Sequence, residues 1–125
     1  MNFSLVCLLA VIVTVPFGAA FLLAPESVGA QYGISGWNPS TLVVARLFGI
    51  ALLYSGAAAL AVRHTRDTRV QKGISTGFAV ASILATSASI HAVTSGAVNA
   101  MGWSTVAIYG VFTLAWASVA FRKPS

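Results

Sequence analysis

The chain has 125 residues, of which 58% are hydrophobic and only 7% are charged, a balance that excludes an ordinary soluble domain. We therefore expect a single integral membrane domain, residues 1–125, with its excess apolar surface facing lipid. The net charge of +5 would suggest a nucleic-acid partner if the basic residues formed a water-exposed patch, but they flank apolar runs, so no nucleic-acid partner is expected.

Four long apolar runs are separated by short polar breaks. We predict membrane-spanning helices at about residues 2–24, 41–62, 73–95 and 101–121, because roughly 20 apolar residues in a helix cross the hydrocarbon core of a bilayer. Only helices and closed barrels satisfy their backbone hydrogen bonds in lipid, and no run alternates with a period of two. Short connections make successive helices antiparallel. The predicted fold class is therefore all-α, a four-transmembrane-helix up-down-up-down bundle.

The first run contains the chain's single cysteine, Cys7. One cysteine excludes an intrachain disulfide framework and a redox-active cysteine pair. The sequence offers no metal-ligating cluster either, and no combination of residues identifies a reaction. No catalytic residue and no metal site are predicted.

The second run contains Arg46, about 6 residues or roughly 9 Å into the predicted helix. His91 lies at a similar depth in the antiparallel third run, and Glu26 directly follows the first. Because charges inside a span are costly and usually have a partner, we predict a ligand-binding cluster of Arg46, His91 and Glu26, completed by Asn99 and Gln31. A neutral His91 both donates and accepts hydrogen bonds, which suits a quinone or pigment as cofactor. The alternative is that Arg46 reaches the outer head groups and His91 bonds to a neighbouring helix.

Small residues recur at helical spacing in the second and third runs. Membrane helices associate through such residues because they allow close backbone approach. We predict helix-packing positions at Gly49 and Gly56 in the second run, and at Gly73, Gly77 and Ala81 in the third, where Ala85 and Ser89 continue the stripe.

The fourth run carries aromatic residues at three- and four-residue spacing, Tyr109, Phe112 and Trp116. Such a ridge is typical of a packing or lipid-facing surface. Contact with a quinone or pigment is the alternative interpretation.

Six of the seven basic residues fall on one side of the predicted bundle. The positive-inside rule places that side, with both chain termini, in the cytoplasm, so we expect a protein integral to a cytoplasmic membrane. The six residues are Arg63, Arg66, Arg69, Lys72, Arg122 and Lys123.

Two stretches carry a family resemblance: LLAPESVGAQYGI after the first span, and ARLFGIALLYSG in the second. They resemble the DoxX-like group of small bacterial four-helix membrane proteins, and the likeness covers the general plan of the whole chain. Some members look like quinone-linked oxidoreductase subunits, which implies a lipophilic redox partner. This sequence lacks a redox-active cysteine pair and a metal cluster, so the resemblance does not imply an independent enzyme.

Two functions follow as hypotheses. The first is a non-catalytic accessory or structural subunit that packs against a larger membrane complex, for example an energy-converting one; its partners would be lipids and either another membrane protein or another copy of the chain. The alternative is a lipophilic-ligand or quinone-binding protein linked to a membrane oxidoreductase. Ion-coupled transport ranks last, because it needs an acidic residue deep in a span and Glu26 and Asp67 both lie at span ends.

Overall fold

The computed structural model describes residues 2–122. Lys123, one of the residues used to predict orientation, lies outside this range. The described part of the chain contains no strand and has four helices long and apolar enough to cross a membrane, which confirms the predicted all-α fold. A short fifth helix, α2, was not predicted. The helices are α1 (Phe3–Leu23), α2 (Pro25–Gln31), α3 (Pro39–Val62), α4 (Thr68–Thr94) and α5 (Gly102–Ala120).

Polar side chains define where three of the long helices begin. The Asn2 side chain accepts a hydrogen bond from the backbone N–H of Ser4 at 2.7 Å, and Asp67 accepts one from Arg69 at 2.9 Å. Asn38 and Thr41 cap each other reciprocally before α3. These bonds satisfy N–H groups that lack a partner within the helix. The cap at Asp67 also explains why α4 begins before the predicted apolar span at residue 73, since the first turn of α4 is polar.

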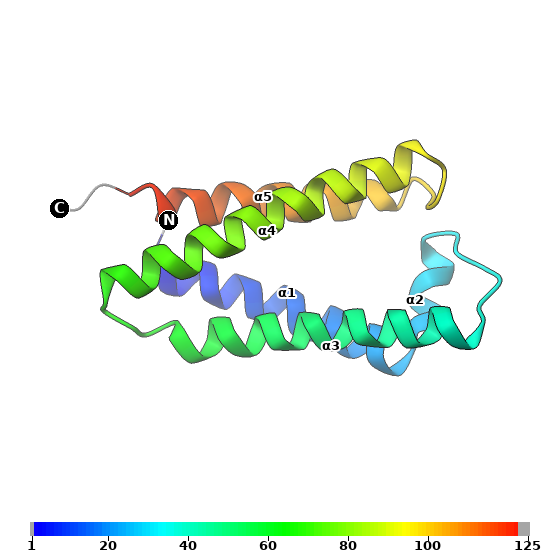
Figure 1. Ribbon diagram of the computed structural model, residues 1–125, viewed down its shortest axis with the longest axis horizontal. Coiled ribbons are helices and arrows are strands. Elements are labelled where there is room, and N and C mark those ends of the chain that lie inside the picture. The colour runs from blue at the N-terminus through cyan, green and yellow to red at the C-terminus, as the bar shows by residue number, and fades with distance from the viewer. Residues whose placement is uncertain (1, 123–125) are drawn as a thin grey trace.

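The long helices form two antiparallel hairpins, α1 with α3 and α4 with α5. Figure 1 shows the hairpins close together at the end that holds both chain termini, and diverging toward α2 and the α4–α5 connection. The up-down-up-down order is as predicted. The four long helices share an apolar core only at the end that holds the termini, because each hairpin packs mainly within itself.

Glycine allows the helices of the first hairpin to touch. A Cβ atom added to Gly49 would lie 2.6 Å from the carbonyl oxygen of Gly18, and one added to Gly18 would lie 2.7 Å from that of Gly49. Gly56 likewise faces Thr14, whose Oγ1 would be 2.7 Å from an added Cβ. Two predicted packing glycines, Gly49 and Gly56, therefore lie in the α1–α3 contact.

The predicted stripe on α4 lies differently. No atom lies within 4 Å of a Cβ added to Gly73 or Gly77, and Ala81 is exposed to the space between the hairpins. The reason is that α4 buries another face, which carries Ser75, Ala79 and Ser82. Within residues 2–122, a Cβ added to Gly73 or Gly77 thus meets no other helix, and packing of this stripe against a partner helix stays a prediction.

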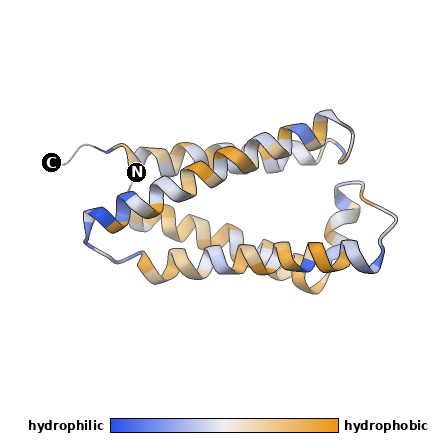
Figure 2. Ribbon diagram, in the orientation of Figure 1, coloured by the Kyte–Doolittle hydropathy of each residue, from blue (hydrophilic) through white to orange (hydrophobic). Residues whose placement is uncertain are grey.

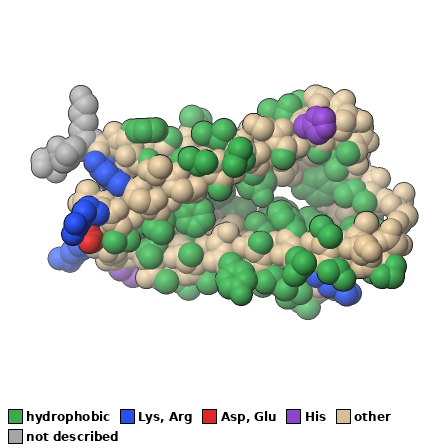
Figure 3. All heavy atoms as spheres, in the orientation of Figure 1, with side chains coloured by type: hydrophobic (Ala, Val, Ile, Leu, Met, Phe, Trp, Pro, Cys, Tyr) green, Lys and Arg blue, Asp and Glu red, His purple; other side chains and the backbone are tan. Residues whose placement is uncertain are grey.

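The apolar core lies at the end of the molecule that holds the termini. The Trp116 side chain is only 2% exposed; it stacks on Phe78 with ring centroids 4.9 Å apart and meets Phe3 edge-on at 6.3 Å. Val6 and Cys7 are fully buried beside them. Elsewhere, large apolar side chains cover the outer surface, and Figures 2 and 3 show hydrophobic residues along all four long helices. This outer surface suits contact with lipid, as in an integral membrane protein.

Candidate functional site

The structure does not join the three residues of the predicted cluster. Glu26 lies in the first turn of α2, Arg46 near the start of α3 and His91 in the last turn of α4, and all three are exposed. Within residues 2–122, no hydrogen bond or ion pair connects them. The α3 and α4 helices belong to different hairpins, so equal depth along the bundle does not bring Arg46 and His91 together.

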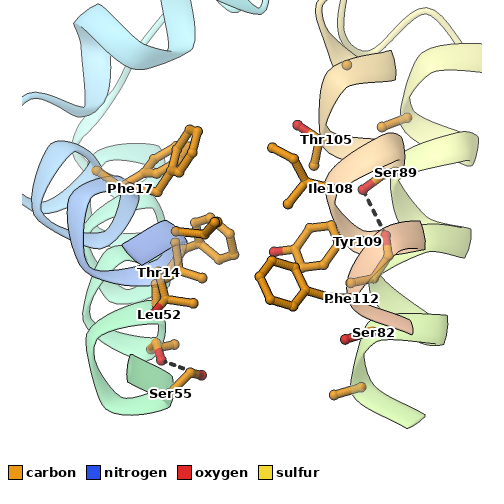
Figure 4. Close-up of a pocket in the computed structure, with 18 of the residues that line it drawn as sticks. Thr14, Phe17, Leu52, Ser55, Ser82, Ser89, Thr105, Ile108, Tyr109 and Phe112 are labelled. Carbon is orange, nitrogen blue, oxygen red and sulfur yellow. Dashed lines mark hydrogen bonds between the residues drawn. The ribbon is translucent and has the colours of Figure 1, made fainter. Parts of the chain in front are cut away.

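A cavity of about 460 Å³ lies between the two hairpins. Figure 4 shows its two walls, with Phe17 and Leu52 on one side facing Ile108, Tyr109 and Phe112 on the other. Figure 3 shows the surface hollowed between the hairpins, so the cavity opens sideways, at the depth of the spans. All five helices contribute lining residues, among them Ala10, Val13, Thr14, Phe17, Gly29, Leu52, Ser55, Ala81, Ser82, Ala85, Ser89, Thr105, Ile108, Tyr109, Phe112 and Trp116.

The aromatic ridge of α5 forms one wall of this cavity. Tyr109, Phe112 and Trp116 all line it, and Phe78 of α4 stacks on Trp116 at its base. The sequence therefore identified these residues as a group, but not the surface they face. Packed aromatic side chains offer a flat, polarisable wall that suits ring-containing molecules.

Small residues of α4 leave room for the cavity. Ala81, Ala85 and Ser89, which continue the stripe from Gly73 and Gly77, lie along its lining. Side chains of one or two heavy atoms leave space between α4 and the opposite hairpin that larger residues would occupy. The outer part of the predicted stripe thus forms a wall rather than a helix–helix contact.

Hydroxyl groups give the cavity limited polarity. Thr14 donates to the carbonyl of Ala10 at 2.6 Å, and Ser55 and Ser89 likewise donate to their own helices. Their oxygens remain acceptors. The hydroxyls of Tyr109 and Ser82 make no hydrogen bond within residues 2–122. Figure 4 shows the Tyr109 hydroxyl directed across the cavity toward Thr14. Tyr109 is therefore a free donor inside the cavity.

Apart from the phenols of Tyr32 and Tyr109, no ionisable side chain lines the cavity among the described residues. That part of the chain also contains no group of three or more His, Cys, Asp and Glu able to hold a metal ion. Because isolated charges are costly in an apolar, water-poor space, the arrangement suits an uncharged occupant.

Both ends of the cavity are closed. At one end lies the core around Trp116. At the other, the connection before α5 bonds to the end of α2: Asn99 donates from its backbone N–H to the carbonyl of Tyr32 at 2.9 Å and from its side chain to Gln31 at 3.1 Å. The Tyr32 hydroxyl also lies 2.8 Å from that of Thr105. Asn99 and Gln31, predicted as members of the Arg46 cluster, instead join the hairpins.

Comparison of the chain with protein-family models, curated proteins and solved structures gives no match.

Proposed function

We propose that this chain is an integral membrane protein that binds a neutral lipophilic molecule between its two hairpins. The observation that carries the proposal is the uncharged, aromatic-lined cavity of about 460 Å³, which opens sideways at the depth of the spans. Small-molecule sites commonly enclose about 300–1,000 Å³ and combine apolar walls with a few polar groups. A molecule dissolved in the bilayer would enter without crossing water.

Ring-containing lipophiles with a hydrogen-bond acceptor, such as quinones, fit the chemistry of the lining. The Tyr109 hydroxyl would donate to a carbonyl, and the rings of Phe112 and Trp116 would contact the head group. In this proposal the ligand contacts residues of α5, and not Arg46, His91 and Glu26 as predicted from the sequence. The proposal gives His91 no part in holding a pigment, because His91 is exposed and does not line the cavity. A link to a membrane oxidoreductase remains part of this proposal.

An accessory or structural subunit of a larger membrane complex is the second candidate. It is favoured by the α4 face that carries Gly73, Gly77, Val80 and Leu84, which recur at three- and four-residue spacing. The two glycines have no neighbour within 4 Å of an added Cβ, and the two larger side chains are exposed. Small residues on an apolar face allow another transmembrane helix to approach, either from a different protein or from a second copy.

The proposed location is the bacterial inner membrane, with the basic end of the molecule in the cytoplasm. Arg63, Arg66, Arg69, Lys72 and Arg122 are all at the end that holds the termini, and Figure 3 shows basic side chains gathered there. The positive-inside rule supports this orientation.

The test is extraction of the full chain in mild detergent, followed by size analysis and mass spectrometry of the bound small molecules. Ala85→Phe places a large side chain in the cavity, and Ala88→Phe is the matched control on the exposed surface of α4. We expect a lipophile to accompany the unsubstituted chain and Ala88→Phe, and to be lost from Ala85→Phe. Equal amounts in both variants would contradict binding in the cavity. A large stoichiometric complex without a lipophile would favour the accessory-subunit candidate.

A further inference from the structure

A second pocket, separate from the cavity, lies at the basic end of the molecule. It has a volume of about 270 Å³ and is polar rather than aromatic. Its walls come from the start of α1, the end of α3, the α3–α4 connection, the start of α4 and the residue after α5. The lining residues are Asn2, Phe3, Ser4, Arg63, His64, Thr65, Gln71 and Arg122.

Two hydrogen bonds hold this pocket in shape. Arg63 donates from Nε to the Ser4 hydroxyl at 3.3 Å, which fixes its guanidinium between α3 and α1. Gln71 donates from its side chain to the carbonyl of Thr65 at 3.0 Å, which ties the connection to α4. A guanidinium has five N–H donors, so those on the two terminal nitrogens of Arg63 remain for a ligand.

The local charge is strongly positive. Arg63 and Arg122 line the pocket, and Arg66, Arg69 and Lys72 lie on the adjacent connection and the first turns of α4. The sequence has only two acidic residues. Asp67 forms an ion pair with Arg69 at 3.9 Å outside the pocket, and Glu26 lies in α2, which follows the opposite end of α1. Neither of these two side-chain carboxylates lines the pocket beside Arg63.

We infer that this pocket binds a phosphate group. Arginine presents two parallel N–H donors that match the oxygens of a phosphate, and Ser4, His64 and the Asn2 side chain add polar contacts around it. The pocket lies where the apolar spans end, which is the level of the lipid head groups, so an anionic phospholipid and free phosphate are the two sources of the same chemistry. The inference is independent of the proposed ligand in the cavity.

The experiment measures thermal unfolding of the purified full chain in dodecyl maltoside micelles. The probes are inorganic phosphate, dioleoyl phosphatidylglycerol, and digalactosyl diacylglycerol, a neutral lipid without phosphate. We expect phosphatidylglycerol to raise the unfolding temperature and the galactolipid not to do so. A similar rise with inorganic phosphate identifies the free anion as a ligand, and a rise with phosphatidylglycerol alone identifies the lipid head group.

Two variants with the same change of charge test the location. Arg63→Gln removes a lining guanidinium, whereas Arg69→Gln removes an exposed one outside the pocket. We expect Arg63→Gln to weaken phosphatidylglycerol binding by about tenfold, the loss of one charge-assisted contact, and Arg69→Gln to change it by less than about twofold. Arg122→Gln provides a second lining position if Arg63→Gln does not fold. Equal weakening by the lining and control variants, or equal stabilisation by the galactolipid, would overturn the inference.

Discussion

Tyr109 is the residue that gives the cavity a directed polar contact. Several serine and threonine hydroxyls around it donate to carbonyls of their own helices, as Thr14 and Ser89 do. The phenol of Tyr109 is too far from its own backbone for such a bond and makes none within residues 2–122. A ligand that accepts one hydrogen bond can therefore take it from this phenol.

Tyr109→Phe should weaken binding of a carbonyl-containing lipophile by about 3- to 10-fold, because one neutral hydrogen bond contributes about 0.5–1.5 kcal/mol. Titration of the purified protein with a soluble quinone analogue, followed by quenching of tryptophan fluorescence, measures the change. Tyr54→Phe is the control, since Tyr54 is 74% exposed and outside the cavity. Equal affinity in both variants would exclude Tyr109 as the donor.

Ser75 is a polar residue buried in the interior of the protein. Its side chain is 0% exposed, and its hydroxyl has no hydrogen-bond partner within residues 2–122. We expect Ser75→Ala to leave the thermal unfolding temperature unchanged or to raise it, because the cost of a buried unsatisfied hydroxyl, about 1–3 kcal/mol, disappears. A clearly lower unfolding temperature would mean that Ser75 has a partner in the native membrane.

At the scale of the element, glycines predicted as packing positions lie in two different environments. Gly49 lets α3 touch the backbone of α1, whereas Gly77 lies beside open space on α4. Sequence spacing predicted both as packing positions, because helices that are apolar on all sides give no pattern that identifies the inward face. Which stripe meets a partner depends on the rotation of each helix about its axis, and that is a property of the folded pairs.

Gly49→Ala and Gly77→Ala should therefore have opposite consequences. At Gly49 the new methyl group would lie 2.6 Å from a backbone oxygen, so α1 and α3 must separate at a cost of about 1–3 kcal/mol. At Gly77 there is no clash, and alanine's better helix propensity should leave stability equal or higher. Unfolding in mixed micelles with a denaturing detergent compares them. If Gly77→Ala proves as destabilising as Gly49→Ala, α4 has a partner helix in the membrane.

At the scale of the whole molecule, the four spans and their antiparallel order could be predicted because lipid imposes a minimum apolar length. The separation of Arg46, His91 and Glu26 could not be predicted, because depth along a helix says nothing of which neighbour a side chain faces. The cavity could not be predicted either. The aromatic ridge at Tyr109 and the small residues near Ala85 are visible in the sequence, but the cavity between the hairpins exists only because the hairpins diverge.

The contact through Asn99 holds the hairpins together at the end remote from the core. Asn99→Ala removes the side-chain bond to Gln31 and the bond that the Asn99 side chain accepts from the N–H of Met101. We expect faster amide hydrogen exchange in residues 29–36 and 95–105, because local opening requires less free energy once these bonds are lost. Exchange near Val6 and Val119 in the core should not change. Uniformly faster exchange would instead indicate loss of global stability.

The division into hairpins also suits insertion during synthesis. The α1–α3 pair is complete once residue 62 has been made, and its glycine contact needs nothing from the later half of the chain. Each pair starts and finishes at the basic end. With that end in the cytoplasm, as proposed above, only the connection within each pair has to pass through the bilayer. The first connection, residues 24–38, carries one charge, Glu26, and the second, residues 95–101, carries none. Because the two connections that cross the bilayer carry almost no charge, inserting the helices pair by pair costs little free energy.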